Sequence, residues 1–347
     1  WCAFCLLGRM RSQKMIKPRI WITSRLSDAT LERAQRDYDV VINHEDTPGT
    51  ADQIIAASAE FDGIVPCHSE HFTAEVVAQF SDRLKIVANH SVGIDHCDLQ
   101  ALKDRGIFVT NTPDVLSDAT AELAMLLMLG AARHAVAGDR IVRSGAWDSW
   151  SPAFMVGKQV TGARLGIIGM GRVGRAFAAK ARGFDMEVHY YNRSALPEDQ
   201  AYGSTYHDSV ESLLSVADFL SLHCPATAET TNLMNAERFA LLPQGAVIVN
   251  SARGALIDET ALMATLSAGH VAAAGLDCFQ NEPGGNPAFT YEWLDELGTP
   301  LGVTTPLIND LCAGDYILEV TDAAGCIFYQ GTSITEPDTI LVNPLFL

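Results

Sequence analysis

The stretch Leu165-Gly166-Ile167-Ile168-Gly169-Met170-Gly171-Arg172-Val173-Gly174 indicates the fold class of this 347-residue chain. A predicted strand over 164–168 leads into a G-x-G-x-x-G turn, and we expect a helix over 175–182. In such a turn the first glycine allows the tight bend, the second lets the backbone approach a pyrophosphate, and the third lets helix and strand pack closely. The first amide groups of the helix attract an anion. The stretch therefore predicts a dinucleotide-binding unit rather than a turn without a ligand.

The residues after the next predicted strand, over 187–191, distinguish NAD from NADP sites. An NAD site carries an acidic residue here, which binds the ribose 2′-hydroxyl. This chain has Asn192, Arg193 and Ser194 instead. A cation and hydrogen-bond donors suit a 2′-phosphate. We therefore expect NADP(H) to be preferred, with NAD(H) as the alternative if Arg193 points into solvent.

Short apolar strands alternate with helical segments on both sides of this motif. The second series of strands is expected at 164–168, 187–191, 219–223, 246–250 and 271–276. The first series is expected, around a helix over 28–36, at 19–23, 40–42, 63–65, 84–88 and 107–109. A helix over 118–133, apolar almost all round, is expected to be buried, and 137–158 to form an irregular arm. The pattern predicts an α/β fold with two parallel-sheet domains.

Composition narrows the classes of partner. The net charge of −18 lacks the basic footprint of a nucleic-acid binder, so neither nucleic acid nor a membrane surface is expected as a partner. The longest apolar run, 123–132, is too short to span a bilayer. Eight scattered cysteines favour reduced thiols and a cytoplasmic protein. The one C-x-x-C pair, Cys2 and Cys5, is interpreted as incidental rather than as a redox or metal centre, and no metal site is expected.

Six ordered motifs between residues 18 and 288 resemble the D-isomer-specific 2-hydroxyacid dehydrogenase family, and within it the glyoxylate and hydroxypyruvate reductase (D-glycerate dehydrogenase) group. Besides the glycine-rich turn they are Ser91-Val92-Gly93-Ile94-Asp95, Ala119-Thr120-Ala121-Glu122-Leu123-Ala124, His223-Cys224-Pro225 with Thr231, Asn250-Ser251-Ala252-Arg253-Gly254, and Gly275-Leu276-Asp277 before Asn281-Glu282-Pro283. The resemblance implies two Rossmann-like domains, one flavodoxin-like and one dinucleotide-binding, with the active site in the cleft between them.

The resemblance also implies roles for individual residues. Arg253 would bind the carboxylate and carbonyl of a small 2-oxo acid, and the N–H groups of Val92 and Gly93 would bind the same carboxylate. Glu282 would be the carboxylate of a catalytic His–Glu pair. Asp277 would hold the nicotinamide carboxamide. The remaining expected cofactor contacts are Thr120, Gly169, Met170, Gly171, Arg172, Val173, Gly174, Asn192, Arg193, Ser194, Cys224, Pro225, Thr231, Ser251 and Ala252.

This family pattern implies a division of the chain. Residues 1–16 would be a non-native leader, 17–112 the substrate (catalytic) domain, and 113–288 the NAD(P)-binding domain with an interdomain helix and a dimer arm. Residues 289–347 form an atypical tail in place of the helix that returns to the substrate domain. The expected activity is NADPH-dependent reduction of glyoxylate or hydroxypyruvate to glycolate or D-glycerate by a homodimer. Trp147, in the arm, either reaches the partner's active site or is an ordinary packed residue.

The proton donor of this chemistry is missing. The family places a His about 18 residues after the Glu, in a Pro-His context, yet all ten histidines lie at or before His270. Residues 254–347 also contain 13 acidic residues and no Lys or Arg. We hypothesise a frame shift near residue 289. The alternative is a true tail on a catalytically silent NAD(P)-binding sensor or partner-binding protein. His90 is the nearest replacement acid in sequence, although His90, His96 and His223 are interpreted as structural.

Overall fold

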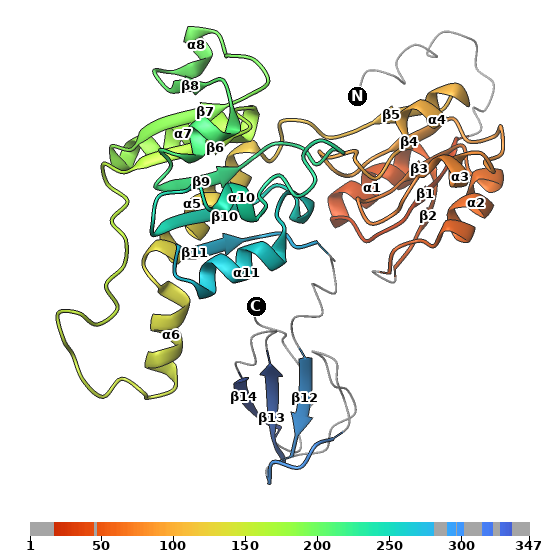
Figure 1. Cartoon of the computed structure of the whole chain (residues 1–347). Coiled ribbons are helices and arrows are strands. Elements are labelled where there is room, and N and C mark those ends of the chain that lie inside the picture. Colours follow the sequence, from red (N-terminus) through yellow and green to blue (C-terminus); the bar gives the residue numbers. More distant parts are fainter. Residues whose placement is uncertain are drawn as a thin grey trace. The chain divides into compact units, whose positions relative to one another are not determined.

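The computed structural model describes residues 17–44, 47–280, 290–295, 297–301, 314–321 and 327–334. The chain divides into two compact units, with the division between Ser117 and Asp118 (Figure 1). The predictions for residues 1–16, Cys2, Cys5 and Glu282 concern residues outside the described part of the chain.

The first unit is built on a parallel sheet with the strand order β2-β1-β3-β4-β5 (Figure 1). This is the flavodoxin-like order 2-1-3-4-5. The strands are β1 (Arg19–Ile22), β2 (Asp39–Ile42), β3 (Gly63–Val65), β4 (Ile86–Ala88) and β5 (Phe108–Thr110). The helices are α1 (Asp28–Asp37), α2 (Ala51–Glu60), α3 (Ala74–Val77) and α4 (Leu99–Asp104). Ile54, Ile64, Phe72, Val87 and Leu102 form the centre of its core.

The second unit carries a six-stranded parallel sheet in the order β11-β10-β9-β6-β7-β8. Counted from β6, this is the dinucleotide-binding order 3-2-1-4-5-6. The strands are β6 (Arg164–Ile168), β7 (Glu187–Tyr191), β8 (Thr205–His207), β9 (Phe219–Leu222), β10 (Ala246–Asn250) and β11 (Val271–Leu276). Every residue of β9 and β10 is buried, as expected for central strands covered on both faces. The predicted pair of parallel-sheet domains is thus confirmed.

Two features of this sheet were missed or shifted. The edge strand β8, Thr-Tyr-His, was not predicted because it is short and lacks an apolar run. The helix after the glycine-rich turn begins at Arg172 rather than Arg175, since the chain becomes helical directly after Gly171.

The helices and 3-10 turns of this unit are α5 (Ser117–Ala132), α6 (Ala135–Arg143), α7 (Arg172–Ala181), η2 (Arg182–Phe184), α8 (Glu198–Ala201), α9 (Val210–Leu214), α10 (Ala236–Phe239), η3 (Gly254–Leu256) and α11 (Glu259–Ser267).

Helix α5 is apolar on more than one face but buries one stripe of side chains. That stripe consists of Ala121, Ala124, Met128 and Ala132, which recur at helical spacing. Gly275 of β11 lets this helix come close, because a Cβ there would lie 2.8 Å from the carbonyl oxygen of Leu127. Leu126, however, is 66% exposed. The expectation that the whole helix is buried is therefore wrong for this face.

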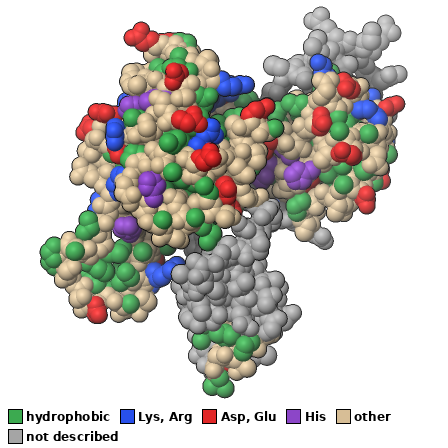
Figure 2. All heavy atoms as spheres, viewed as in Figure 1, with side chains coloured by type: hydrophobic (Ala, Val, Ile, Leu, Met, Phe, Trp, Pro, Cys, Tyr) green, Lys and Arg blue, Asp and Glu red, His purple; other side chains and the backbone are tan. Residues whose placement is uncertain are grey.

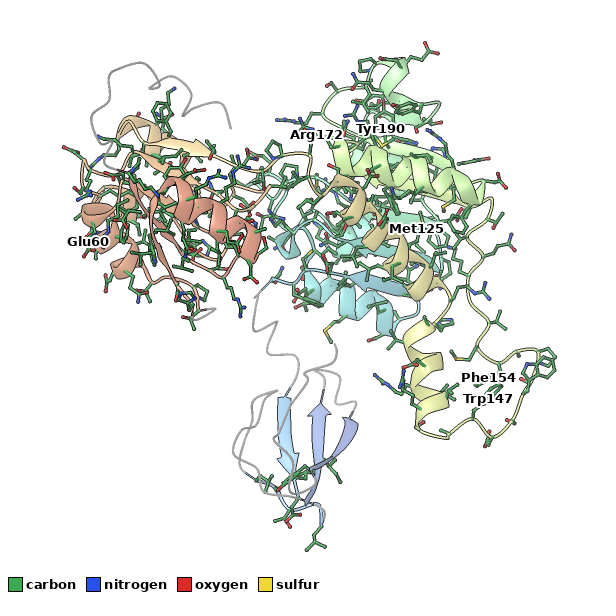
Figure 3. The ribbon with its side chains drawn as sticks, turned by 180° about the vertical axis from the view of Figure 1, so that it is seen from behind. Glu60, Met125, Trp147, Phe154, Arg172 and Tyr190 are labelled. Atoms are coloured by element: carbon green, nitrogen blue, oxygen red, sulfur yellow. The ribbon has the colours of Figure 1, made fainter. Side chains whose placement is uncertain are left out.

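The expected irregular arm begins as a helix. The break between α5 and α6 bends the chain by 65°, and His134 adopts a left-handed conformation (φ 54°) at the break. An ion pair four residues apart, Asp139 with Arg143 at 2.8 Å, supports α6. No residue of α6 is buried. Residues 144–158 are not helical, and Figure 3 shows Trp147 and Phe154 on this segment.

No single described helix is long and apolar enough to cross a membrane. Helices α5 and α6 together meet the length and composition required, as a pair bent at their break.

After residue 289, the described residues form a three-stranded antiparallel sheet in the order β12-β13-β14. Its strands are β12 (Thr290–Leu294), β13 (Gly314–Thr321) and β14 (Ile327–Ile334).

Candidate functional site

The three glycines of the G-x-G-x-x-G turn are required for different reasons. Gly169 has φ +98°, and a Cβ there would lie 2.5 Å from the Cys224 nitrogen. A Cβ on Gly174 would lie 2.3 Å from the Gly169 oxygen. A Cβ on Gly171, by contrast, would meet no atom within 4 Å. Two glycines are thus demanded by the protein's own packing, while Gly171 faces open space, as close approach of a pyrophosphate requires.

This turn lies where the strand order of the second sheet reverses. Strand β6 pairs with β7 on one side and with β9 on the other. Ligands of open α/β sheets bind beyond the carboxyl ends of the strands at such a point. The His223 N–H donates to the Ile168 oxygen at 2.8 Å, which joins the ends of β9 and β6. The predicted cofactor residues after β6, β7 and β9 therefore share one edge of the sheet.

Asn192, directly after β7, supports the glycine-rich turn. Its Oδ1 accepts a hydrogen bond from the Met170 N–H at 2.7 Å. Because the oxygen is used in this way, the free end of the amide is its NH₂ donor. Arg193 and Ser194 are exposed. A hydrogen bond from Thr227 holds the pKa of the exposed Glu229 carboxyl below its ordinary value, and the positive charge of Arg193 contributes to the shift.

The segment after β9 contains groups that stay uncharged. The His223 Nε2 lies 2.8 Å from the Ser221 Oγ, and its ring lies 5.2 Å from that of Phe177. Burial lowers the pKa of His223 to about 4, so the ring is neutral at pH 7. Burial raises the pKa of the Cys224 thiol to about 11. These contacts support a structural role for His223.

Arg253 is positioned by a buried amide. Asn250 is fully buried, donates from Nδ2 to the Arg253 oxygen at 2.8 Å, and accepts on Oδ1 from the Ala252 N–H at 3.0 Å. The Asp277 N–H donates to the Asn250 oxygen at 2.9 Å. The turns after β10 and β11 are therefore tied together. Sequence reasoning gave Asn250 no role, although a polar residue that ends an apolar strand was a usable signal.

The same turn holds an unpaired polar atom. Ser251 Oγ is buried and has no hydrogen-bond partner among the described residues. A buried hydroxyl without a partner costs free energy, of the order of 1–3 kcal/mol, unless a ligand satisfies it. Arg253 itself is half-buried and donates from Nη1 to the Ala252 oxygen at 2.7 Å. The site therefore fits a dinucleotide on two counts, the open side of Gly171 and the orphan hydroxyl of Ser251.

The other predicted cofactor residues lie on three elements. Thr120 is partly buried in α5. Arg172 and Val173 open α7. Pro225 accepts a hydrogen bond on its oxygen from Thr230 Oγ1, and Thr231 is exposed in the same loop.

The loop over 91–93, which is predicted to bind the substrate carboxylate, lies in the first unit. Its carbonyl oxygens accept hydrogen bonds from neighbouring groups of the protein. The Ser91 oxygen accepts from the Thr112 N–H, and the Val92 oxygen accepts from Asn111 Nδ2 at 2.9 Å. The Gly93 oxygen accepts from Ser91 Oγ at 2.7 Å. These bonds fix the main chain whose N–H groups are expected to bind the substrate.

The neighbouring histidines have different surroundings. His96 is 7% exposed, and its Nε2 lies 2.7 Å from Asn89 Oδ1. Burial lowers the pKa of His96, which favours the neutral ring. His90 is exposed, and its main-chain N–H donates to the Pro66 oxygen at 2.9 Å. These contacts support a structural role for His96, and the role of His90 stays a prediction.

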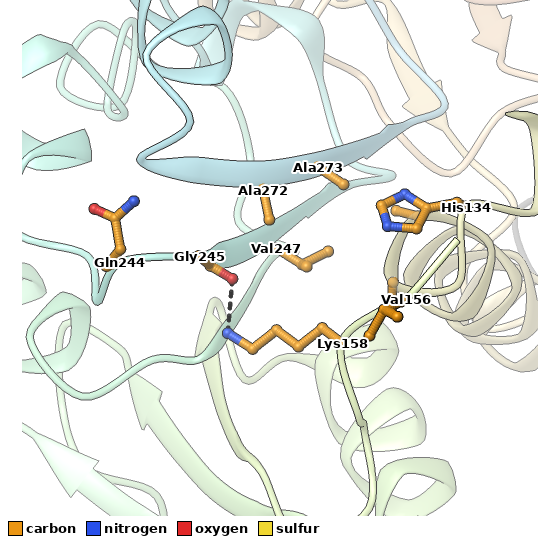
Figure 4. A pocket seen from close by; sticks show the side chains of 11 residues that line it. His134, Val156, Lys158, Gln244, Gly245, Val247, Ala272 and Ala273 are labelled. Atoms are coloured by element: carbon orange, nitrogen blue, oxygen red, sulfur yellow. Dashed lines mark hydrogen bonds between the residues drawn. The ribbon is translucent and has the colours of Figure 1, made fainter. Parts of the chain in front are cut away.

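A cavity of about 370 Å³ lies at the amino ends of strands in the second sheet (Figure 4). There Lys158 Nζ donates to the Gly245 oxygen at 2.8 Å and to the Asp218 oxygen at 3.0 Å, which joins the beginnings of β9 and β10. Burial lowers the pKa of this ammonium group. Because the cavity faces the amino ends of the strands, it is separate from the predicted dinucleotide residues.

Comparison with known proteins agrees with this arrangement. The protein-family model described as "D-isomer specific 2-hydroxyacid dehydrogenase, NAD binding domain" matches residues 125–297. The glycerate dehydrogenase of Hyphomicrobium methylovorum is 40% identical over 277 residues, which cover 79% of this chain and 86% of that protein. The glyoxylate reductase of Pyrococcus horikoshii is 39% identical over 272 residues, which cover 77% and 81%.

A solved structure is similar as well. A Polaromonas protein assigned to the D-isomer specific 2-hydroxyacid dehydrogenases aligns with a TM-score of 0.73 and 41% identity, over 78% of this chain and 85% of that one. The chain therefore belongs to the D-isomer-specific 2-hydroxyacid dehydrogenase family, whose members are NAD(P)-dependent oxidoreductases that act on the CH–OH group of 2-hydroxy acids.

Proposed function

We propose that this chain is built to reduce glyoxylate or hydroxypyruvate with NADPH, giving glycolate or D-glycerate. The names of its relatives support the substrate class. The observation that carries the proposal is the open side of Gly171 in a turn whose other two glycines are closed by the protein itself. When bound, the reduced nicotinamide supplies a hydride to the carbonyl carbon.

The chain's own residues would bind and polarise the substrate. Arg253 presents a planar guanidinium suited to the carboxylate and carbonyl of a 2-oxo acid. Asn250 donates a hydrogen bond to the main-chain oxygen of Arg253, so the Arg253 side chain is attached to a fixed turn of the backbone. The N–H groups of Val92 and Gly93 are proposed to bind the same carboxylate, and Asp277 the carboxamide of the cofactor. As the alkoxide forms, the charge on Arg253 would stabilise it.

NADP preference is proposed from the end of β7. Asn192 uses its oxygen on the Met170 N–H, which leaves a donor for the 2′ position. Ser194 adds a hydroxyl, and the exposed Arg193 adds a positive charge. Donors and a cation are complementary to a phosphate, whereas an NAD site offers a carboxylate.

The proton step is proposed to be impaired. Glu282 would orient a His, but no His follows His270 in the sequence. Loss of a general acid typically costs about 10²–10⁴ in rate. The missing His favours a second candidate function, that of a catalytically silent NAD(P)-binding sensor or partner-binding protein.

The exposed arm is proposed to join two copies in a homodimer. Figure 2 shows hydrophobic side chains gathered over α6 and the segment that follows it. Trp147 is 54% exposed, Trp150 75% and Val156 67%. An apolar surface of this kind is typical of an interaction site.

We also propose that the protein is cytoplasmic, because its cysteines are expected to be reduced thiols.

Turnover separates the two candidate functions. We would follow NADPH oxidation by the full chain with glyoxylate and with hydroxypyruvate, with enzyme at high concentration. A slow, substrate-dependent rate supports the impaired reductase. Tight NADPH binding with no substrate-dependent oxidation supports the silent protein, and absence of NADPH binding would contradict both.

A further inference from the structure

The loop that joins β7 to α8 is fixed at both of its ends. At the first end, Asn192 Oδ1 accepts a hydrogen bond from the Met170 N–H at 2.7 Å. At the second end, the Leu196 N–H donates to Tyr190 Oη at 2.9 Å, and the Leu196 side chain packs against the core. The exposed residues between the two ends are Arg193, Ser194 and Ala195. The side chains that are proposed to meet a 2′-phosphate therefore lie on a short segment with two anchors.

The second anchor is a core residue. Tyr190 lies on β7 (Figure 3), is 1% exposed, and belongs to the hydrophobic cluster under that face of the sheet. Its ring lies 5.4 Å from the ring of Tyr206 on the neighbouring strand β8. A buried tyrosine hydroxyl normally takes a hydrogen-bond partner, and here that partner is the main-chain N–H of Leu196. Tyr190 thus connects the rigid interior of the sheet to the loop.

The residues after the loop are held as well. Pro197 follows Leu196 and disfavours a helical conformation there, so α8 cannot extend backwards into the loop. Gln200 Oε1 of α8 accepts a hydrogen bond from Arg175 Nη1 of α7 at 2.9 Å. Helix α8 is therefore tied to the helix that follows the glycine-rich turn. The conformational freedom of the loop is limited to residues 193–195.

Anchoring of this kind favours one cofactor over the other. A loop that is ordered before the ligand arrives loses less conformational entropy on binding, so its contacts contribute more to affinity. The charge of Arg193 and the hydroxyl of Ser194 are complementary to a 2′-phosphate, whereas a 2′-hydroxyl gains little from a cation. Loosening the loop should therefore weaken NADPH more than NADH.

We propose that Tyr190 is a positioning residue for NADP preference. Its hydroxyl holds the Leu196 N–H, so that Arg193 and Ser194 are in place before a 2′-phosphate binds. Because Tyr190 is buried, it acts through the loop and not by contact with the cofactor. This inference rests on the proposed preference for NADP.

The test uses Tyr190→Phe, which keeps the ring in the core and removes the hydroxyl. Tyr191→Phe is the matched control, because it removes a hydroxyl from the next residue of the strand, which packs against the cluster on the other face of the sheet. Fluorescence titration of the full chain measures the affinity for NADPH and for NADH. Hydrogen–deuterium exchange of a peptic fragment over 192–200, without cofactor, measures how well the loop is held.

We expect Tyr190→Phe to speed exchange in this fragment and to weaken NADPH binding about 3- to 10-fold, as is typical for loss of one hydrogen bond. NADH affinity should stay within about 2-fold, and Tyr191→Phe should change none of these values. Equal weakening of both dinucleotides, or an unchanged ratio of their affinities, would overturn the proposal, since a purely structural residue affects both alike. A wild-type protein that binds NADH as tightly as NADPH would instead overturn the proposed preference on which the inference rests.

A double-mutant cycle tests whether Tyr190 acts through Arg193. If Tyr190 positions this side chain, Arg193→Gln should weaken NADPH binding less in the Tyr190→Phe background than in the wild type. In the Tyr191→Phe background the effect of Arg193→Gln should be undiminished. Fully additive effects of Tyr190→Phe and Arg193→Gln would show that the two residues act independently and would overturn the positioning role.

Discussion

Asn192 Oδ1 accepts a hydrogen bond from the Met170 N–H at 2.7 Å, so the residue after β7 supports the turn that begins the dinucleotide site. The bond also settles which end of the amide is free, because the N–H of Met170 can pair only with an acceptor. We therefore expect a cofactor to meet an NH₂ group at this position. In an aspartate the same contact would leave a carboxylate oxygen free instead.

Because of this contact, Asn192→Asp is the substitution that tests cofactor preference most directly. The carboxylate can keep the bond to Met170 while it repels a 2′-phosphate and accepts from a 2′-hydroxyl. Hydrogen bonds to charged groups contribute about 1.5–3 kcal/mol, so we expect NADPH to bind roughly 10- to 100-fold more weakly and NADH more tightly. Fluorescence titration with each dinucleotide measures this. Arg193→Gln is the matched control, which should weaken NADPH alone. An unchanged ratio of affinities in Asn192→Asp would disprove the assignment.

The glycines of the turn provide a second pair of variants. Gly171→Ala places a methyl group in open space, so the unfolding temperature should change little while dinucleotide affinity falls at least 10-fold. Gly174→Ala forces a methyl group against the Gly169 oxygen, so the protein should lose about 1–3 kcal/mol of stability or more. Thermal unfolding and NADPH titration of both variants measure the difference. Full NADPH affinity in Gly171→Ala would show that no ligand approaches there.

Arg253 should act on the substrate and not on the dinucleotide. Arg253→Gln keeps hydrogen-bonding capacity and loses the charge, so glyoxylate-dependent turnover should fall at least 100-fold while NADPH affinity stays within about 3-fold. Arg36→Gln is a matched control, because Arg36 is exposed and paired with Asp37 in α1. Initial rates over a range of glyoxylate concentrations test this. Equal losses in both variants would remove Arg253 from the site.

His223 should contribute to acid sensitivity. Its pKa is about 4 in the folded protein and near 6.5 in an unfolded chain. The unfolded state therefore binds the proton first as pH falls, and stability is lost between about pH 6.5 and 4, by up to about 3 kcal/mol. His223→Gln cannot take up this proton, so its stability should fall less steeply over that range. Denaturant unfolding at pH 7, 5.5 and 4.5 compares the two, and parallel curves would contradict a neutral His223 ring in the folded protein.

The sequence was informative wherever a local pattern determines the structure. The strand ending at Ile168 and the glycines after it needed no distant contact to be interpreted. The position of α6 was missed because its side chains face solvent and leave no buried stripe. The bond between Asn192 and Met170 joins residues on neighbouring strand ends, and the exposure of Leu126 depends on what covers α5. Such properties follow from packing rather than from periodicity.

The most direct measurement is a titration of the full chain with NADPH and, separately, with NADH. The account predicts a saturable NADPH complex with a Kd at least about 10-fold lower than that of NADH, because the end of β7 offers donors and a cation. Tighter binding of NADH would contradict the proposed preference, and absence of binding to either would contradict the dinucleotide site itself.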